Sequence, residues 1–391
     1  MFSTNKAQLS IFLCLCMCLG IGIFRFSYTA LLPSTRESFE WSVQFASILS
    51  SANLLGYLIG AFWAMHLPQT RRMTLYIQGA AIAGSLSLLC CAFDNFPQTW
   101  YMFWRIVSGI CGGLIMILSP SIVAQCCELK DRFQINFIGF SGIGIGVLLA
   151  TLFLPYLDRI STQTAWLILA SFAGIITIVL SIFLSRFKAQ LSTQVAPTST
   201  TTELNIFFFS LLAVYGASAF AYVPHSLFWI DYLTDVLQLD LYWMNLNWIL
   251  YGLGSSLGAF TSYLLAKKFG NIQALKILYS CYVFAILIAI VSQYSILTFM
   301  SSFLTGLLNP AVVFLTSYTI LQRYTASYKK LWSIATILFA TVQLIGGLSF
   351  SGLQVLGVDY HQQFLLAAFV LLLGTVQFFW ITRKKEQVEY I

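Results

Sequence analysis

The sequence predicts an all-α integral membrane protein, in which twelve transmembrane helices form two pseudo-symmetric six-helix bundles. Of the 391 residues, 59% are hydrophobic and only 8% are charged, whereas a soluble domain carries roughly 25% charged residues. The mean hydropathy is +0.84. Twelve apolar runs of about 20 residues follow one another, and each is long enough to cross a bilayer as a helix.

In chain order, the apolar runs predict helices at 9–33, 42–66, 73–93, 99–123, 133–156, 164–185, 205–230, 242–266, 273–291, 295–321, 331–353 and 361–381. A chain in hydrocarbon must satisfy its own backbone hydrogen bonds, and these runs lack the alternation of barrel strands, so we expect helices. No small-x-small cleavage site closes the first run before Arg25, which favours a retained helix over a signal peptide. The nine cysteines lie in or at the end of apolar runs, where we expect buried filler and not disulfides or metal ligands.

Basic residues lie almost entirely on one side of the predicted membrane. With a cytoplasmic N-terminus, Arg36 and Arg159 lie outside, and Arg25 and Arg105 lie within helices. The other sixteen are then cytoplasmic: Lys6, Arg71, Arg72, Lys130, Arg132, Arg186, Lys188, Lys267, Lys268, Lys276, Arg323, Lys329, Lys330, Arg383, Lys384 and Lys385. This bias predicts that both termini are cytoplasmic. The formal charge of +7 thus reflects topology and not a nucleic-acid interface, because the basic residues are scattered over short loops.

A polar segment, "KAQLSTQVAPTSTTTEL" at 188–204, separates the sixth and seventh runs. Its composition and Pro197 predict a flexible cytoplasmic linker between an N-terminal bundle, 1–187, and a C-terminal bundle, 205–391. Motifs recur between the two halves at nearly constant spacing, which predicts a duplicated six-helix unit. The matches are "LGYLIGAF" at 55–62 with "LGSSLGAF" at 253–260, Gly109 with Gly306, and Gly22, Phe26 and Tyr28 with Gly216, Phe220 and Tyr222.

Two homologous six-helix halves joined by a cytoplasmic linker resemble the major facilitator superfamily over the whole chain. "RIVSGICGG" at 105–113 is similar to that family's helix-4 signature, and "GAFTSYLLAKKFG" at 258–270 is similar to its loop after helix 8. The first-half loop, "GAFWAMHLPQTRR" at 60–72, keeps the glycine and the basic pair but lacks the usual acidic residue. "RFSYTALLP" together with "ANLLGYLIGA" resembles the YbfB/YjiJ branch of bacterial transporters. The resemblance implies the major facilitator fold.

The resemblance also implies a monomeric secondary transporter of the bacterial inner membrane that moves a small organic solute by alternating access. Proton-coupled efflux is the favoured prediction, which makes protons an expected partner. Membrane lipid is expected to surround the helices. Uptake or exchange of an organic anion is the alternative, and a receptor that transports nothing stays open. We expect no enzyme activity, cofactor or metal site, because the sequence has no phosphate loop, no H-E-x-x-H motif and no intramembrane pair of aspartates.

Two arginines lie within predicted helices, and no carboxylate lies at mid-membrane depth to pair with them. All thirteen Asp and Glu residues fall in loops, tails or helix ends. At 1.5 Å per residue, Arg25 and Arg105 lie about 10–12 Å from the outer ends of their helices, and a charge at mid-bilayer costs at least about 2.5 kcal/mol. Either the guanidinium groups bind an anionic or strongly polar substrate, or Arg25 reaches the surface and Arg105 packs its helix.

Polar side chains near these arginines complete the predicted substrate site. Thr29 shares a helix face with Arg25, and Ser108 shares one with Arg105, by the 3–4 spacing. The predicted site also includes polar residues of other helices: Asn53, His225 and Asn309. The alternative for the two asparagines is an interhelical hydrogen bond.

His225 and Asp231 are the candidate proton carriers. An imidazole titrates near neutral pH, so His225 either carries the proton or packs as a polar residue beside Pro224. Asp231 lies at the outer end of the same helix. For the gating motion, Pro224 and Pro310 predict kinks, because each proline frees a backbone carbonyl. The resemblance of the two loops adds further gating candidates: Gly60, Arg71, Arg72, Gly258 and Lys267.

Overall fold

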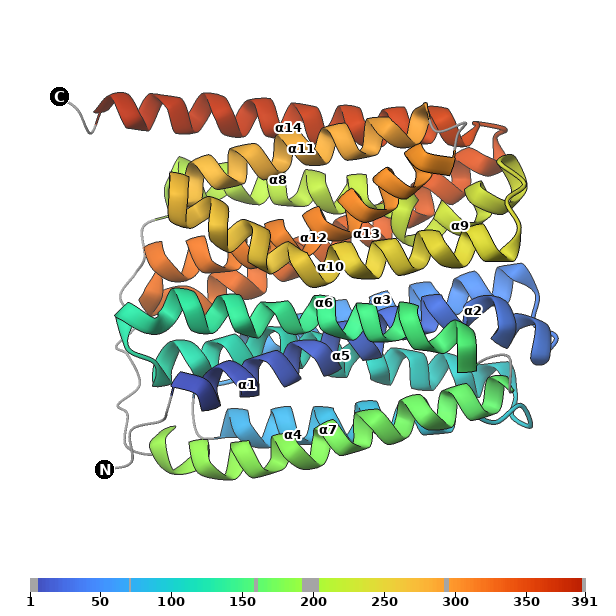
Figure 1. Cartoon of the computed structure of the whole chain (residues 1–391). Coiled ribbons are helices and arrows are strands. Elements are labelled where there is room, and N and C mark those ends of the chain that lie inside the picture. Colours follow the sequence, from blue (N-terminus) through green and yellow to red (C-terminus); the bar gives the residue numbers. More distant parts are fainter. Residues whose placement is uncertain (1–5, 70–71, 158–160, 192–203, 292–294, 389–391) are drawn as a thin grey trace. The chain divides into compact units, whose positions relative to one another are not determined.

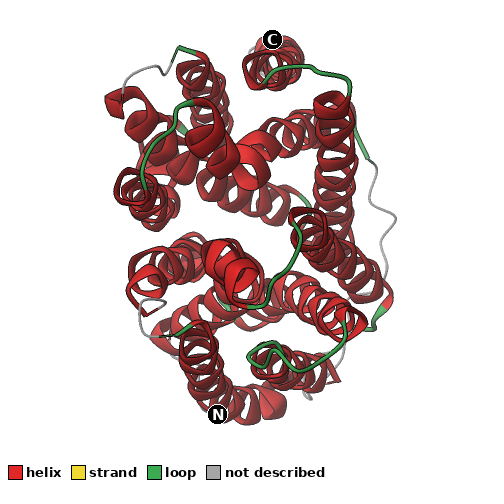
Figure 2. Ribbon diagram, turned by 90° about the vertical axis from the view of Figure 1, so that its right-hand side faces the viewer, coloured by secondary structure: helices red, strands yellow, loops and turns green. Residues whose placement is uncertain are grey.

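The computed structural model describes residues 6–69, 72–157, 161–191, 204–291 and 295–388. Within these ranges the regular elements are all helical (Figures 1 and 2). Twelve helices of this described part are long and apolar enough to span a membrane. The predicted all-α class and the predicted number of spans are therefore confirmed.

The first six spans are formed by residues 6–191. Their elements are α1 (Lys6–Met17), the π-helical segment η1 (Cys18–Phe26), α2 (Ser27–Ser38), α3 (Val43–His66), α4 (Arg72–Cys90), α5 (Gln98–Cys126), the 3₁₀ turn η2 (Leu129–Asp131), α6 (Arg132–Leu157) and α7 (Thr162–Leu191). The first span is continuous through α1, η1 and α2. Ser42 caps α3 by accepting a hydrogen bond from the Phe45 amide at 3.1 Å, and α3 ends just before Pro68, which disfavours helical backbone in the residue that precedes it.

The last six spans follow from residue 206. Their elements are α8 (Ile206–Val223), η3 (Pro224–Phe228), α9 (Trp229–Asp231), η4 (Tyr232–Val236), α10 (Leu241–Phe269), α11 (Asn271–Ile290), α12 (Ser295–Arg323), the 3₁₀ turn η5 (Thr325–Ser327), α13 (Tyr328–Val355) and α14 (Tyr360–Val388). The seventh span contains two π-helical turns and runs to Val236, beyond the predicted end at 230. Asp235 therefore lies within a helical turn and not in a loop.

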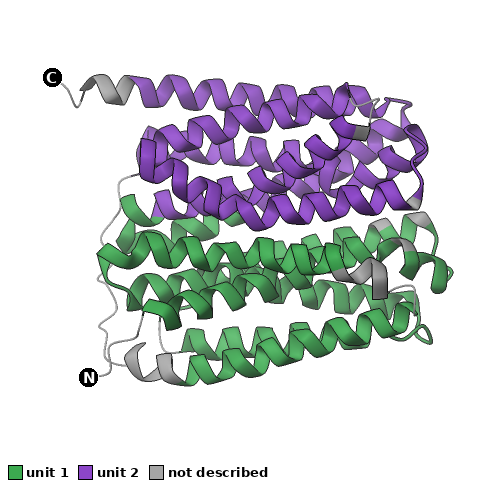
Figure 3. Cartoon of the chain, in the orientation of Figure 1, with its two compact units in different colours: residues 1–200, 321–337 green, residues 201–320, 338–391 purple. Residues whose placement is uncertain are grey.

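The chain divides into two compact units (Figure 3). Unit 1 comprises residues 1–200 and 321–337, and unit 2 comprises residues 201–320 and 338–391. Helix α13 therefore belongs to both: Tyr328–Ile337 lies in unit 1 and Leu338–Val355 lies in unit 2. Much of the predicted linker, 192–203, lies outside the described residues.

Each unit contains a very close helix crossing made by glycines of the sequence repeat. In unit 1, a β-carbon on Gly109 of α5 would lie 2.0 Å from the Asn53 carbonyl oxygen of α3. In unit 2, a β-carbon on Gly306 of α12 would lie 2.2 Å from the Tyr251 carbonyl oxygen of α10. Both distances are far below van der Waals contact, so only glycine lets these backbones approach. The matched glycines therefore make equivalent crossings, α3 on α5 and α10 on α12.

Two internal prolines free carbonyl groups that other helices satisfy. Pro120 has no N–H to donate to the Met116 carbonyl four residues earlier, and the Trp332 indole nitrogen donates to that oxygen at 3.1 Å. In unit 2, Pro310 likewise frees the Gly306 carbonyl, which accepts a hydrogen bond from the Ser255 hydroxyl at 3.2 Å. Both prolines thus stay within hydrocarbon-spanning helices without leaving a buried carbonyl unpaired.

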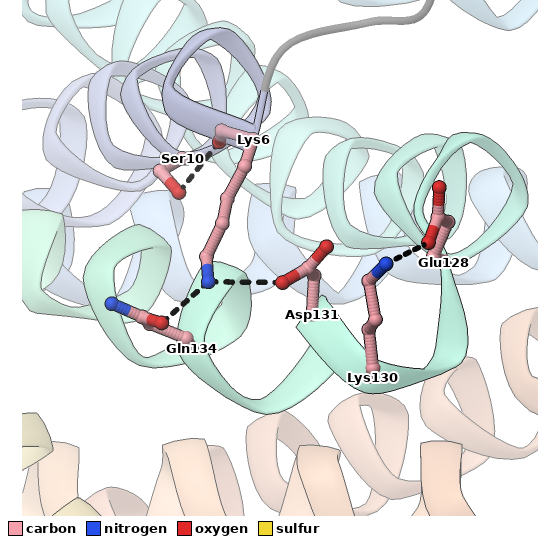
Figure 4. A network of polar contacts seen from close by, with 6 residues as sticks. All are labelled: Lys6, Ser10, Glu128, Lys130, Asp131 and Gln134. Carbon is pink, nitrogen blue, oxygen red and sulfur yellow. Dashed lines mark hydrogen bonds and ion pairs between the residues drawn. The ribbon is translucent and has the colours of Figure 1, made fainter.

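The start of α1 is tied to the start of α6 by a polar network (Figure 4). The Lys6 ammonium lies 2.9 Å from a carboxylate oxygen of Asp131 and donates to the Gln134 side chain at 2.5 Å. A neighbouring pair joins Lys130 to Glu128 at 2.8 Å. These contacts fix the helix ends on the side that the charge bias assigns to the cytoplasm.

Candidate functional site

The unit 1 site is built around one backbone carbonyl in the π-helical segment of the first span. The carbonyl oxygen of Phe24 accepts hydrogen bonds from the Ser108 hydroxyl at 2.9 Å and from the Asn53 amide at 3.3 Å. The Arg105 Nη1 lies 3.5 Å from the same oxygen. A carbonyl oxygen has two lone pairs, so the third and longest contact is weak. The structure thus brings together Asn53, Arg105 and Ser108, three of the predicted site residues.

Arg105 is a buried cation with hydrogen-bonding capacity to spare. Arg105 is 2% exposed, and its Nε has no hydrogen-bond partner. Among the described residues it also has no acidic partner. The guanidinium carbon lies 4.2 Å from the ring centre of Tyr28, and this cation–π contact offsets part of the desolvation cost. A planar group with unused N–H donors is suited to bind a carboxylate or another anion.

Arg25 belongs to the same π-helical segment as Phe24 and is half-buried. Its guanidinium carbon lies 5.2 Å from the ring centre of Tyr57 and 5.6 Å from that of Phe26. Thr29, one turn further on in α2, is also half-buried. The two predicted arginines therefore share an environment of tyrosine rings, but only Arg105 is enclosed.

His225 belongs to a separate hydrogen-bonded network in unit 2. The Ser301 hydroxyl donates to the Ala285 carbonyl at 3.1 Å, so its single proton is used. The His225 Nε2, 2.8 Å from the same hydroxyl, must then be the donor, so the neutral ring would carry its proton on Nε2. His225 Nδ1 is buried and has no partner.

Aromatic packing and a second chain of hydrogen bonds hold this histidine. The His225 ring stacks on Trp229 at 4.7 Å, and the Trp229 indole donates to the Ser302 hydroxyl at 2.9 Å. Ser302 in turn donates to the Asn247 side chain at 2.7 Å. The network crosses from the seventh span to α12 and α10, so it fixes the π-helical turn at Pro224–Phe228.

The other predicted substrate residue of unit 2 lies in α12. Asn309 is buried, at 7% exposed, and its Oδ1 has no hydrogen-bond partner. One turn earlier, the buried Thr305 hydroxyl is also without a partner. These two polar atoms share a helix face, but the structure does not join them to the His225 network.

The predicted gating residues other than the two prolines fall into two groups. Gly60 and Gly258 lie at the close crossings, where an added β-carbon would lie 2.2 Å from the Ile110 carbonyl oxygen and 2.4 Å from that of Leu307. Arg72 and Lys267 are exposed at helix ends, and Arg71 lies outside the described residues. Asp231, the second candidate proton carrier, is half-buried.

Sequence reasoning did not identify the tyrosines that surround the arginines. Tyr28 and Tyr57 are both buried, and the only signal for Tyr28 was its match to Tyr222 in the repeat. The hydroxyl of Tyr222 in unit 2 is hydrogen-bonded to that of Tyr251. The repeat therefore keeps the tyrosine in both units but pairs it with a cation in unit 1 and with a second phenol in unit 2.

Comparison with known proteins agrees with this architecture. The human organic anion transporter MFSD10 (TETRAN) superposes with a TM-score of 0.72 at 15% identity, over 96% of this chain and 100% of that one. A bacterial homologue of the iron transporter ferroportin superposes with a TM-score of 0.70 at 14% identity, over 96% and 98% of the two chains. At these identities the likeness concerns the fold alone, which confirms the predicted major facilitator fold.

No curated protein sequence matches the chain. A family model described as "Uncharacterised MFS-type transporter YbfB" matches residues 17–378. This match confirms the predicted resemblance. Because it covers most of the sequence, the chain belongs to this family of major-facilitator transporters.

Proposed function

We propose that the chain is a secondary active transporter that moves a small anionic or strongly polar organic solute across the bacterial inner membrane by alternating access. The observation that carries this proposal is the buried Arg105, which has an unused Nε and no acidic partner among the described residues. A carboxylate or similar group of the solute supplies the missing counter-charge. The fold-level neighbour named as an organic anion transporter is consistent with this substrate class.

For the direction and the energy source we propose outward movement coupled to protons, which is the prediction that the family resemblance favoured. Of the two candidate carriers, Asp231 is the better placed, because it is half-buried whereas His225 is 1% exposed and bonded through Nε2. Neutral His225 then positions the π-helical turn. Uptake or exchange of an organic anion is the alternative, in which the solute itself balances Arg105.

Binding of matched ligand pairs tests the substrate class. The purified protein is heated with carboxylates and with the corresponding uncharged carboxamides, for example benzoate against benzamide and larger aromatic pairs. A ligand at a hundred times its Kd stabilises the folded state by about 2.7 kcal/mol, which raises the Tm measurably. We expect stabilisation by carboxylates only. Equal stabilisation by both members of every pair would contradict an anion site.

Transport of the best-bound anion in proteoliposomes then tests the coupling. A protonophore should abolish accumulation driven by an inward-acidic or outward-acidic pH gradient. His225→Gln should keep the accumulation driven by the pH gradient, whereas Asp231→Asn should lose it. A transport rate that depends on neither the pH gradient nor the voltage would rule out proton coupling and would favour exchange.

The topology can be checked independently of transport. Membrane-impermeant labelling of single cysteines, introduced into a cysteine-free background, should report 188–204, both chain termini and the loop at 267–276 on the cytoplasmic side. The charge bias predicts this result. Labelling of the two termini from opposite sides would require an odd number of spans and would end the twelve-helix reading.

A further inference from the structure

A buried lysine holds residues 321–337 against the rest of unit 1, to which this segment belongs. The Lys329 ammonium donates to the carbonyl oxygens of Ala64 at 2.9 Å and Met65 at 3.3 Å, and also to that of Leu67. The lysine is 5% exposed. All three N–H donors of the ammonium group therefore have an acceptor, so this cation is satisfied although none of its acceptors is acidic.

The three acceptors lie where a helix most needs a donor. Helix α3 ends at His66, and the last carbonyls of a helix have no partner within it. Pro68 deepens this deficit, because it has no N–H to offer the Ala64 carbonyl four residues earlier. The carbonyl end of a helix also carries partial negative charge, which favours a cation. Lys329 thus caps the C-terminus of α3 both by donating hydrogen bonds to its free carbonyls and by placing a positive charge at its negative end.

Two further contacts hold the same segment to unit 1. Trp332 donates to the Met116 carbonyl that Pro120 leaves free, at 3.1 Å. Arg132 at the start of α6 donates to the Thr325 hydroxyl at 3.1 Å. Every acceptor in the set is an uncharged oxygen, so separation leaves no buried carboxylate behind. Breaking the contact therefore costs individual hydrogen bonds and not the exposure of an unpaired buried acid, which keeps the contact reversible.

We propose that Lys329 is a positioning residue for transport. Its ammonium group is a detachable cap on the C-terminus of α3, which holds 321–337 against the rest of unit 1 in one state of the transport cycle and releases this segment in the other. Helix α13 continues without a break from this segment into Leu338–Val355 of unit 2. Release of Tyr328–Ile337 is therefore passed along one stiff helix. The role in transport rests on the alternating access proposed above, whereas the cap itself can be tested without transport.

The sequence offers a matched control one residue away. Lys330 is exposed, so Lys330→Met removes the same charge without touching the cap. We compare Lys329→Met, Lys330→Met and the unaltered protein in lipid nanodiscs without added solute, by hydrogen–deuterium exchange. In Lys329→Met, peptides covering 60–69 and 321–337 should exchange about ten-fold faster or more, because bonds from a charged donor are lost. Lys330→Met should exchange like the unaltered protein.

Two more variants separate the cap from general damage. Lys329→Arg keeps the charge and several donors, so it should restore slow exchange in part. Trp332→Phe removes only the bond to Met116 and should accelerate exchange several-fold in 321–337, with little effect at 60–69. Equal exchange in Lys329→Met and Lys330→Met, or acceleration spread evenly over α4, α5 and α6, overturns the proposal. Because no solute is present, failure of the transport proposal leaves this readout valid.

Discussion

Replacing Arg105 with alanine should lower the affinity for the anionic solute by about one to two decades, because a hydrogen bond from a charged donor contributes about 1.5–3 kcal/mol. The guanidinium group lies over Tyr28 and has an unused Nε, so the solute is its natural charge partner. The measurement is the Kd of the best carboxylate of the matched pairs, with equal amounts of purified folded protein.

Three companion variants show whether the loss belongs to the site. Arg105→Lys should recover only part of the affinity, because an ammonium group lacks the planar fork. Arg25→Ala should also weaken binding strongly, if both arginines face the solute. Arg36→Ala, which removes an exposed arginine, should change nothing. Wild-type affinity in both Arg105→Ala and Arg25→Ala would show that the arginines only support their helices.

Replacing Gly109 with leucine should prevent unit 1 from folding into a stable form. Even a β-carbon at this position would lie 2.0 Å from the Asn53 carbonyl oxygen and 2.7 Å from the Tyr57 amide nitrogen. Backbone atoms cannot move aside as a side chain does, so α3 and α5 must separate, and overpacking of this kind costs about 1–3 kcal/mol or more. We expect loss of monodisperse protein after detergent extraction. Gly109→Ala should survive with a clearly lowered Tm.

The controls for this prediction are other glycines of the chain. A β-carbon on Gly79 of α4 or Gly174 of α7 would meet nothing within 4 Å, so alanine at either position should keep the Tm or raise it slightly. Gly306→Ala in unit 2 should behave like Gly109→Ala, since it meets the Tyr251 backbone in the equivalent crossing. A Gly109→Ala protein as stable as Gly79→Ala would contradict the close crossing.

Most of the fold could be predicted because hydrophobicity and loop charge are strong local signals. Apolar runs of sufficient length set the twelve spans, and motifs repeated between the halves predicted a duplicated six-helix unit. The helix ends were less accurate. The seventh span continues to Val236, because its π-helical turns still satisfy the backbone where the side chains have become polar. Composition carries little information about such turns.

The site could be predicted only in part, because contacts between distant segments leave little trace in a single sequence. Arg105 was conspicuous as a charge in an apolar helix, and the 3–4 spacing added Ser108. The carbonyl of Phe24, on which Ser108 and Asn53 converge, has no signature of its own, since every residue carries a carbonyl. Lys329 was counted only as one of many cytoplasmic cations. Its partners are carbonyl groups 262–265 residues earlier.

Pro120 and Pro310 each leave a carbonyl that a side chain of another helix satisfies, and this arrangement limits which substitutions the sequence can accept during evolution. If Trp332 were replaced while Pro120 remains, the Met116 carbonyl would lose its donor and be left buried without a partner. If Pro120 were first replaced by a residue with an N–H, α5 would make its own bond to Met116, and the two lone pairs of that oxygen could accept both donors. The order of the two substitutions is therefore constrained, since loss of Trp332 is tolerated better after loss of Pro120. The same holds for Pro310 and Ser255, which ties α12 to α10 in evolution as well as in space.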